Sequence, residues 1–344
     1  MGLRWLAGVA LALVLAGGAA AAVDNAGTPR CRAAAIGADG FCEVDGARLH
    51  FVDWGGRGPP LILLAGFGDS ARVFDDLAPR LTKARHVYSL TRRGFGRSAH
   101  TPGDYSAARL GDDVVAMMDA LGIGRADIVG HSAAGAEMVL VAKRHPARVS
   151  RLVYLDAAYD RSGALAMEAQ DPANRAPPAA ALASFEAFTA WRQAVLGTRS
   201  AAVGANVRET FRVADGRLVR RTAPAQLLEL STAGLMEVAP DYAAIPAPSL
   251  AIYAPKDQPE QLSPGTPAAM QEASRQYGLR RVRPWMLREQ ARFLEEAPCG
   301  VAVELSAETH YFYLRQPRWT AETILSFLTA PAPCRWRLST HRVP

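Results

Sequence analysis

The stretch Ala126-Asp127-Ile128-Val129-Gly130-His131-Ser132-Ala133-Ala134-Gly135 places a serine between a short apolar strand and a helical pattern that runs to Arg144. A sharp strand-to-helix turn of this kind exposes the serine hydroxyl at the start of a helix, where backbone N–H groups favour negative charge. The small neighbours of Ser132 prevent clashes in such a turn. The alternative interpretation is an ordinary serine that caps the following helix. The stretch therefore makes Ser132 a candidate nucleophile.

Apolar strands alternate with helical patterns on both sides of this stretch. Candidate strands lie at 61–64, 86–90, 126–129, 151–155, 249–253 and 301–305, and candidate helices at 110–121, 132–144 and 319–328. Continuous apolar runs are expected of strands that are buried on both faces. The alternation predicts an α/β fold with a mostly parallel central sheet and helices on both faces. Asp45-Gly46 also predicts a hairpin over 41–54.

The alternation stops between residues 159 and 245, a segment rich in Ala and Pro. Helical stretches are expected at 185–196 and 227–236, and Asp215-Gly216 predicts a small hairpin within 211–221. Long insertions in α/β folds usually serve a function. We therefore expect a largely helical cap over a site, with the core divided into residues 23–158 and 246–330 and a tail at 331–344.

Composition excludes several classes of function. The chain has 344 residues, 49% of them hydrophobic, and a net charge of +6. Its Lys and Arg residues are scattered, without the basic run typical of nucleic-acid binding. The cysteine spacings lack the close pairs of a zinc site. The expected partner is a small-molecule substrate, with no nucleic acid and no metal or organic cofactor, and the oligomeric state stays open.

Residues 1–22 resemble a cleavable signal peptide. Arg4 gives a positive start, Leu6–Leu15 is a short apolar core, and cleavage is expected near Ala21 or Ala22. The alternative is an uncleaved membrane anchor, which the short apolar core disfavours. The segment predicts export to the periplasm or the medium, with no stable membrane insertion after cleavage.

Four cysteines agree with export, because an even number in a secreted chain suggests disulfides. Cys31 and Cys42 bracket a short loop, and Cys299 and Cys334 lie near the C-terminal end. The sequence leaves all three connectivities open, and we expect the two local pairs.

A serine nucleophile needs a base and an acid that orients the base. His310 follows the last strand, at an edge of the sheet from which it can reach Ser132. Asp257 follows the strand 249–253 and is the favoured acid, while Asp156, at the end of the strand 151–155, is the alternative. The chain order Ser132, Asp257, His310 fits a parallel α/β sheet. His131 is expected to point away from the turn and to act as a packing residue.

A tetrahedral intermediate also needs hydrogen-bond donors for its oxyanion. The backbone N–H of Ala133 is the first candidate. The second is the backbone N–H of Phe67, in the loop Ala65-Gly66-Phe67-Gly68 after the first buried strand. The alternative interpretation of this loop is a simple glycine-rich turn.

Taken together, these stretches resemble the α/β-hydrolase superfamily over roughly residues 44–328. The resemblance is carried by the serine turn, the Phe67 loop, Arg93-Gly94-Phe95-Gly96-Arg97-Ser98, Asp257 and His310. Three positions depart from the family pattern. Ala134 stands where the motif has glycine, Ala65 where many relatives have histidine, and Thr91 where many have aspartate.

The resemblance implies a capped serine hydrolase. Relatives that open epoxides use an aspartate at the position of Ser132, so an acyl-enzyme route is expected, with carboxylic esters or lactones of small to medium apolar substrates as the substrate class. One alternative is an aminopeptidase of the proline-iminopeptidase type, for which Glu186 or Glu229 would hold the amine. The other is a non-catalytic binding protein, suggested by Ala65 and Ala134.

Overall fold

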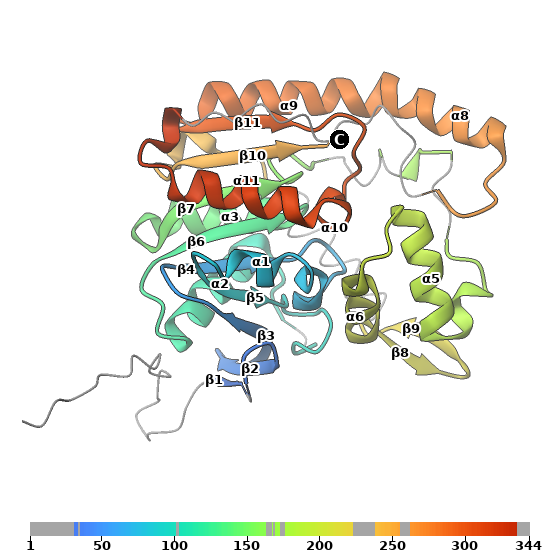
Figure 1. Ribbon diagram of the computed structural model, residues 1–344, viewed down its shortest axis with the longest axis horizontal. Coiled ribbons are helices and arrows are strands. Elements are labelled where there is room, and N and C mark those ends of the chain that lie inside the picture. The colour runs from blue at the N-terminus through green and yellow to red at the C-terminus, as the bar shows by residue number, and fades with distance from the viewer. Residues whose placement is uncertain are drawn as a thin grey trace, which may run out of the picture.

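The computed structural model describes residues 31–335 except 34, 101–102, 163–166, 168, 173–175, 223–237 and 255–261. Nine strands of this part of the chain form one sheet in the order β1-β2-β3-β5-β4-β6-β7-β10-β11 (Figure 1). Their bounds are β1 Cys31–Ala33, β2 Asp39–Val44, β3 Ala47–Gly55, β4 Pro60–Leu64, β5 His86–Leu90, β6 Ala126–His131, β7 Val149–Leu155, β10 Ser249–Tyr253 and β11 Gly300–Glu304.

The central strands pair in parallel, from β5 through β4, β6, β7 and β10 to β11. All six residues of β6 and all five of β10 are buried, as their continuous apolar runs predict. The mostly parallel sheet predicted from the sequence is therefore confirmed. Parallel pairing brings the carboxyl ends of these strands to one edge, where Ser132 follows β6 directly.

The first three strands are antiparallel to their neighbours. The β2–β3 hairpin turns at Asp45 and Gly46, whose φ angles are +45° and +73°. Two successive left-handed residues are what a tight two-residue hairpin turn requires, so the predicted hairpin is confirmed. Cys31 of β1 pairs directly with Cys42 of β2 and forms a disulfide with it. Cys299 and Cys334 form the second disulfide, as expected.

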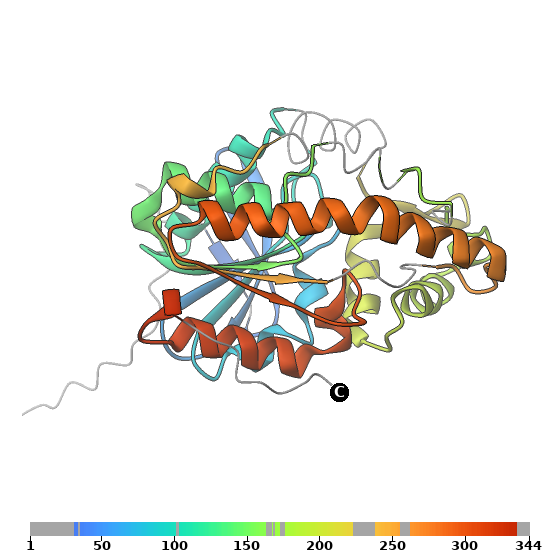
Figure 2. The same cartoon turned by 90° about the horizontal axis from the view of Figure 1, so that it is seen from above.

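Helices cover both faces of the sheet (Figure 2). Buried residues of α2, α3 and α9 share a core with one face, while those of α1 and α11 pack on the other. Their bounds are α1 Ala78–Leu81, α2 Ala107–Ala120, α3 Ala134–Arg144, α8 Ala268–Tyr277, α9 Arg283–Glu296, α10 Phe312–Arg315 and α11 Pro317–Thr329. A π-helical turn, Gly278–Val282 (η5), joins α8 to α9, and short 3-10 turns include η1, Ala71–Phe74. The helix pair α8–α9 was not predicted from the sequence.

The inserted segment 159–245 contributes α5 Phe185–Leu196, α6 Ala201–Thr210 and the hairpin of β8 Phe211–Ala214 with β9 Arg217–Arg220. The helix at 185–196 and the hairpin at Asp215-Gly216 are confirmed, whereas α6 was not predicted. The expected helix at 227–236 lies outside the described residues. Figure 1 shows these elements together beside the sheet, on the side toward which the β10 arrow points.

Apolar side chains join the inserted segment to the rest of the fold. Phe188 of α5 and Phe211 of β8 belong to the same buried cluster as Tyr311 and Tyr313, which follow His310. In the part of the chain that the structure describes, no helix is long and apolar enough to cross a membrane. The residues 1–22 expected to form a signal peptide lie outside the described residues.

Candidate functional site

Ser132 lies at the turn between β6 and α3 in a strained backbone conformation. Its φ angle is +56°, in the left-handed region that residues other than glycine rarely adopt. Its N–H donates to the carbonyl of Leu155 on the neighbouring strand at 3.1 Å. The residue is 8% exposed. Strain of this kind persists only where the surrounding structure fixes it, so the fold holds the Ser132 hydroxyl in one place.

Packing around this turn explains why alanine is tolerated at position 134. A Cβ on Gly130 would lie 2.3 Å from the sulfur of Met138 and 3.0 Å from the Cβ of Ala134. A Cβ on Gly135 would lie 2.0 Å from the carbonyl oxygen of Ala157. Glycine is therefore required at 130 and 135, and the Ala134 side chain fits because Gly130 has none.

His310 lies between Ser132 and a carboxylate. Its Nε2 is 2.8 Å from the Oγ of Ser132, and its Nδ1 is 2.5 Å from the Oδ2 of Asp156. The His310 side chain is 15% exposed and that of Asp156 is 2% exposed. The structure thus brings together the predicted serine, the predicted histidine and the aspartate that the sequence had offered as the alternative.

Among the described residues, Asp156 takes the position of the acid. Asp257, the favoured residue at the sequence level, lies in the segment 255–261, outside the described residues. Both aspartates follow strands that are neighbours in the sheet, β7 and β10, which is why the sequence pattern fits either. The described contact at Nδ1 favours Asp156, and the choice of Asp257 from the sequence stays a prediction.

Asp156 is held as a hydrogen-bond acceptor on both carboxylate oxygens. Its Oδ1 accepts from the hydroxyl of Tyr159 and, at 3.1 Å, from the N–H of Ala254. Its Oδ2 faces His310. Asp156 also has a positive φ angle, +46°, at the end of β7. These contacts orient the carboxylate, and the carboxylate in turn fixes the tautomer of His310 with the proton on Nδ1.

His131 packs beside this site and also forms a hydrogen bond with the backbone of His310. It is fully buried, its Nε2 lies 3.0 Å from the carbonyl oxygen of His310, and the two ring centroids are 4.5 Å apart. Because a carbonyl only accepts, Nε2 carries the proton and Nδ1 does not. Burial, reinforced by the nearby His310, holds the pKa of His131 well below its ordinary value. His131 is thus a neutral donor that fixes the backbone at His310.

The loop after β4 lies against the serine turn. A Cβ on Gly66 would come within 2.7 Å of the Nδ1 of His131 and 3.3 Å of the Cβ of Ser132, so this position requires glycine. Among the hydrogen bonds of the described residues, none uses the N–H of Phe67 or of Ala133. Both predicted oxyanion donors are therefore available beside Ser132.

Arg92 fixes the direction of one of these N–H groups. Its Nη2 donates to the carbonyl of Ala65 at 2.9 Å and its Nη1 donates to the carbonyl of Gly66 at 3.2 Å. In a trans peptide the C=O and the N–H point in opposite directions. Because the Gly66 carbonyl is tied to Arg92, the Phe67 N–H of the same peptide points away from Arg92.

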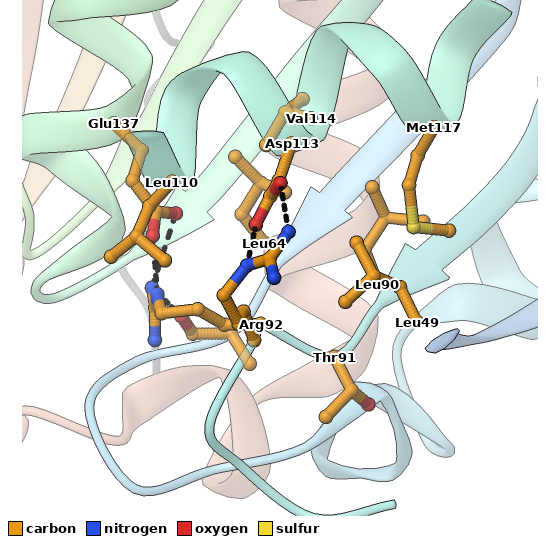
Figure 3. A pocket seen from close by; sticks show the side chains of 12 residues that line it. Leu49, Leu64, Leu90, Thr91, Arg92, Leu110, Asp113, Val114, Met117 and Glu137 are labelled. Carbon is orange, nitrogen blue, oxygen red and sulfur yellow. Dashed lines mark hydrogen bonds and ion pairs between the residues drawn. The ribbon is translucent and has the colours of Figure 1, made fainter. Parts of the chain in front are cut away.

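Arg92 is itself anchored on the helix that follows the serine. Its Nε and Nη2 donate to the two carboxylate oxygens of Glu137 on α3, and both side chains are at most 5% exposed (Figure 3). Burial raises the pKa of Glu137, and Arg92 opposes that shift. A small cavity lies beside the pair, with Leu64, Leu110 and Met117 among its lining, and it offers about 20 Å³ for the centres of water molecules. That is room for about one water, so the cavity serves packing rather than a substrate.

Sequence patterns did not identify Arg92 or Glu137 as site residues. Ala65, where many relatives have a bracing histidine, was the only signal. Thr91, one of the departures from the family pattern, is 1% exposed and its Oγ1 accepts from the N–H of Ala71, which makes it structural. Glu186 faces solvent, with a side chain 78% exposed and 3.8 Å from Arg208, and Glu229 lies outside the described residues.

Comparison with known proteins agrees with this geometry. Residues 59–223 match the α/β-hydrolase fold family. A putative carbamate hydrolase, RutD, from Caulobacter segnis is 36% identical over 116 residues, which are 33% of this chain and 43% of that protein. This chain therefore matches less than half of the length of that relative.

Two solved structures are similar over most of the chain. E-2-(acetamidomethylene)succinate hydrolase has a TM-score of 0.62 at 21% identity, covering 85% of this chain and 99% of that one. The enol-lactonase from Burkholderia xenovorans LB400 has a TM-score of 0.54 at 22% identity, covering 84% and 100%. At such identities the likeness concerns the fold. The sheet order, the strained serine turn and these matches together show that the chain has the α/β-hydrolase fold.

Proposed function

We propose that this protein is a serine hydrolase that cleaves carboxylic esters or lactones of small to medium substrates through an acyl-enzyme intermediate. One observation carries the proposal: the Oγ of Ser132, the imidazole of His310 and the carboxylate of Asp156 form a continuous hydrogen-bonded chain. A serine hydroxyl is a weak nucleophile unless a positioned base takes its proton.

In the proposed reaction His310 Nε2 accepts the Ser132 proton while Oγ attacks the substrate carbonyl. Asp156 stabilises the imidazolium that forms and keeps the ring in place. His310 then gives the proton to the departing alcohol, which leaves an ester on Ser132. Water, deprotonated by His310, attacks that ester and releases the acid.

The N–H groups of Phe67 and Ala133 are the proposed donors to the oxyanion. Both lack other partners among the described residues, and Arg92, bound to the Gly66 carbonyl, fixes the direction of the Phe67 N–H. Donors that are fixed before the reaction need no reorganisation as charge develops, and removing one typically lowers kcat by about 10²–10³-fold.

The comparisons support hydrolysis of an acyl compound, since the relatives named above are described as a carbamate hydrolase, an enol-lactonase and a succinate-derivative hydrolase. The aminopeptidase alternative has less support, because Glu186 is exposed to solvent and paired with Arg208. The binding-protein alternative rested on Ala65 and Ala134. Packing accommodates Ala134, and Arg92 braces the loop at Ala65, so both objections are weakened.

The experiment that tests the function uses ethyl and p-nitrophenyl esters of graded acyl length, with wild type and Ser132→Ala. We expect hydrolysis by wild type, a loss of at least about 10³-fold in Ser132→Ala, and labelling of Ser132 by a fluorophosphonate. Parent-rate hydrolysis by Ser132→Ala would refute the mechanism, and an inert Ser132 in a folded protein would favour a binding role.

We also propose that the protein is exported by its N-terminal segment. The two disulfides support this proposal, because such bonds persist in oxidising compartments. Fractionation of cells that produce the full chain, with the mature N-terminus determined by mass spectrometry, tests it. A start near Ala22 or Val23 is expected, and an intact Met1 in a cytosolic fraction would contradict it.

A further inference from the structure

An arginine of the inserted segment lies beside the oxyanion loop. The Nη1 of Arg220, on β9, lies 3.1 Å from the point where a Cβ on Gly68 would stand. Gly68 has a φ of +82°, and it follows Phe67 directly. From these positions and the 3.8 Å between successive Cα atoms, the guanidinium lies within about 10 Å of the Phe67 N–H.

Among the described residues, the Arg220 guanidinium has no counter-ion. The Cζ of Arg220 lies 5.0 Å from the ring centroid of Phe211, a cation–π contact. In the part of the chain that the structure describes, no ion pair or hydrogen bond involves the Arg220 side chain. Most arginines beside the sheet are different: Arg92 and Arg93, for example, bind Glu137 and Asp113. A guanidinium has five N–H donors, so Arg220 offers a full set to a ligand.

The surroundings of Arg220 combine exposure with low hydration. The residue is exposed, yet desolvation lowers its pKa, with Arg192 lowering it further and Asp69 opposing the shift. An ion pair made in such partly desolvated surroundings is screened less than one at an open surface.

A second arginine strengthens the positive potential there. Arg192 of α5 lies over the ring of Tyr311, the residue after His310, with its Cζ 5.2 Å from the ring centroid. Arg192 and Arg220 thus approach the site from two different elements of the inserted segment. They meet the loop that follows β4 and the segment that carries His310.

Among the described residues, Asp69 is the acid that acts on Arg220, and it is already engaged. Its Oδ1 accepts from the Nδ2 of Asn206 at 2.7 Å, and its Oδ2 accepts from the hydroxyl of Tyr311 at 3.1 Å. Asn206 in turn holds the N–H of Ser70 at 2.8 Å. These bonds fix Asp69 as part of the joint between the inserted segment and the core, where it leaves the N–H groups of Arg220 unoccupied.

We propose that Arg220, assisted by Arg192, forms a subsite for a carboxylate of the substrate, so that the enzyme prefers esters whose acyl part ends in a carboxylate a few bonds from the scissile carbonyl. The planar guanidinium matches a carboxylate with two parallel hydrogen bonds. The separation of at most about 10 Å between Arg220 and the Phe67 N–H suits the half-ester of a short dicarboxylic acid. This assignment rests on the proposed function.

The test compares monoethyl glutarate with ethyl pentanoate, which has the same acyl length and no carboxylate, by pH-stat. Wild type, Arg220→Gln, Arg220→Lys and the control Arg217→Gln are assayed. Arg217 is exposed on the same strand, three residues away and on the opposite face. We expect wild type to prefer the half-ester, and Arg220→Gln to lower its kcat/KM at least about tenfold while ethyl pentanoate changes less than about twofold. Arg220→Lys should retain part of the preference, and Arg217→Gln should behave as wild type.

Further arms separate the outcomes. Monoethyl glutarate carries its charge on the acyl side, whereas 4-carboxyphenyl butyrate carries it on the leaving group. A preference for the second alone would overturn the assignment to the acyl part. Equal losses on charged and neutral esters in Arg220→Gln would overturn the subsite while leaving the hydrolase intact. If wild type cleaves no ester, calorimetric titration with glutarate still decides: binding by wild type that is lost in Arg220→Gln supports the subsite, and absence of binding refutes it.

Discussion

Replacing Arg92 by Met should separate the stability of the fold from the geometry of its oxyanion loop. The substitution removes the donors to the Ala65 and Gly66 carbonyls, at 2.9 and 3.2 Å, and leaves Glu137 buried without its partner. Hydrogen bonds from charged groups contribute about 1.5–3 kcal/mol each, and breaking a buried ion pair costs about 3–5 kcal/mol. We expect Arg92→Met to lose about 3–5 kcal/mol of unfolding free energy.

The catalytic effect has a different origin. Without Arg92 the Gly66–Phe67 peptide can rotate, because its carbonyl keeps only the 3.3 Å bond from the N–H of Asp69. A misdirected Phe67 N–H removes one donor to the oxyanion, for which the expected fall in kcat is about 10²-fold. The KM should change little, since the ground-state carbonyl depends less on this donor.

The double variant Arg92→Met/Glu137→Met distinguishes the two effects. Removing the orphaned carboxylate should restore most of the stability, because an apolar pair can replace a buried ion pair. The kcat should stay low, because the loop carbonyls remain without donors. The assay is the kcat and KM of each variant on one p-nitrophenyl ester, with thermal denaturation alongside. If kcat recovered together with stability, Arg92 would be a structural residue only, and the account of the loop would be wrong.

Three further predictions concern stability. Burial, opposed by Arg72, raises the pKa of Asp75 to about 7. Between about pH 4 and pH 7 the folded state therefore keeps a proton on Asp75 that the unfolded state has lost. The free energy of unfolding falls as the pH rises through this range. Asp75→Asn should therefore stabilise by at least about 1 kcal/mol at pH 8 and by less at pH 4 in urea titrations, and equal effects at both would contradict the shift. The pH dependence due to His131 has the opposite sign. Below about pH 6.5 the unfolded chain binds a proton at His131, whereas the buried ring of the folded state stays neutral, so the free energy of unfolding falls as the pH falls. His131→Phe should remove this dependence, a slope of about 1.4 kcal/mol per pH unit. The Cys299–Cys334 disulfide joins residues that are 35 positions apart in the chain. Removing it by Cys299→Ser should lower the free energy of unfolding by about 3–4 kcal/mol, and an unchanged melting temperature would show that the bond is dispensable.

The strands and Ser132 were predictable because their signals are local. A buried parallel strand gives a continuous apolar run, and the serine turn needs small residues within six positions. The helix pair α8–α9 was missed for the same reason. It buries only Ser274, Met286 and Phe293, and it contains Gly278 near its middle, so its sequence lacks a clear apolar face.

The choice of the acid was not a local question. Asp156 and Asp257 both follow strands whose carboxyl ends meet at one edge of the sheet, and the path of each loop decides which carboxylate reaches His310. Arg92 illustrates the same limit, because its partners lie 26, 27 and 45 residues away in the chain. Which glycine of the serine turn is required also depends on a distant contact, that of Gly135 with Ala157.

The central claim is that Ser132, His310 and Asp156 act as one catalytic unit. The most direct measurement is the rate at which a p-nitrophenyl ester acylates Ser132 in Asp156→Asn and in Asp257→Asn, followed by the burst of p-nitrophenolate. The account predicts a fall of about 10³–10⁴-fold in Asp156→Asn, since the wrong tautomer of His310 would result, and a change of only a few-fold in Asp257→Asn. A large loss in Asp257→Asn with Asp156→Asn near the wild-type rate would contradict it.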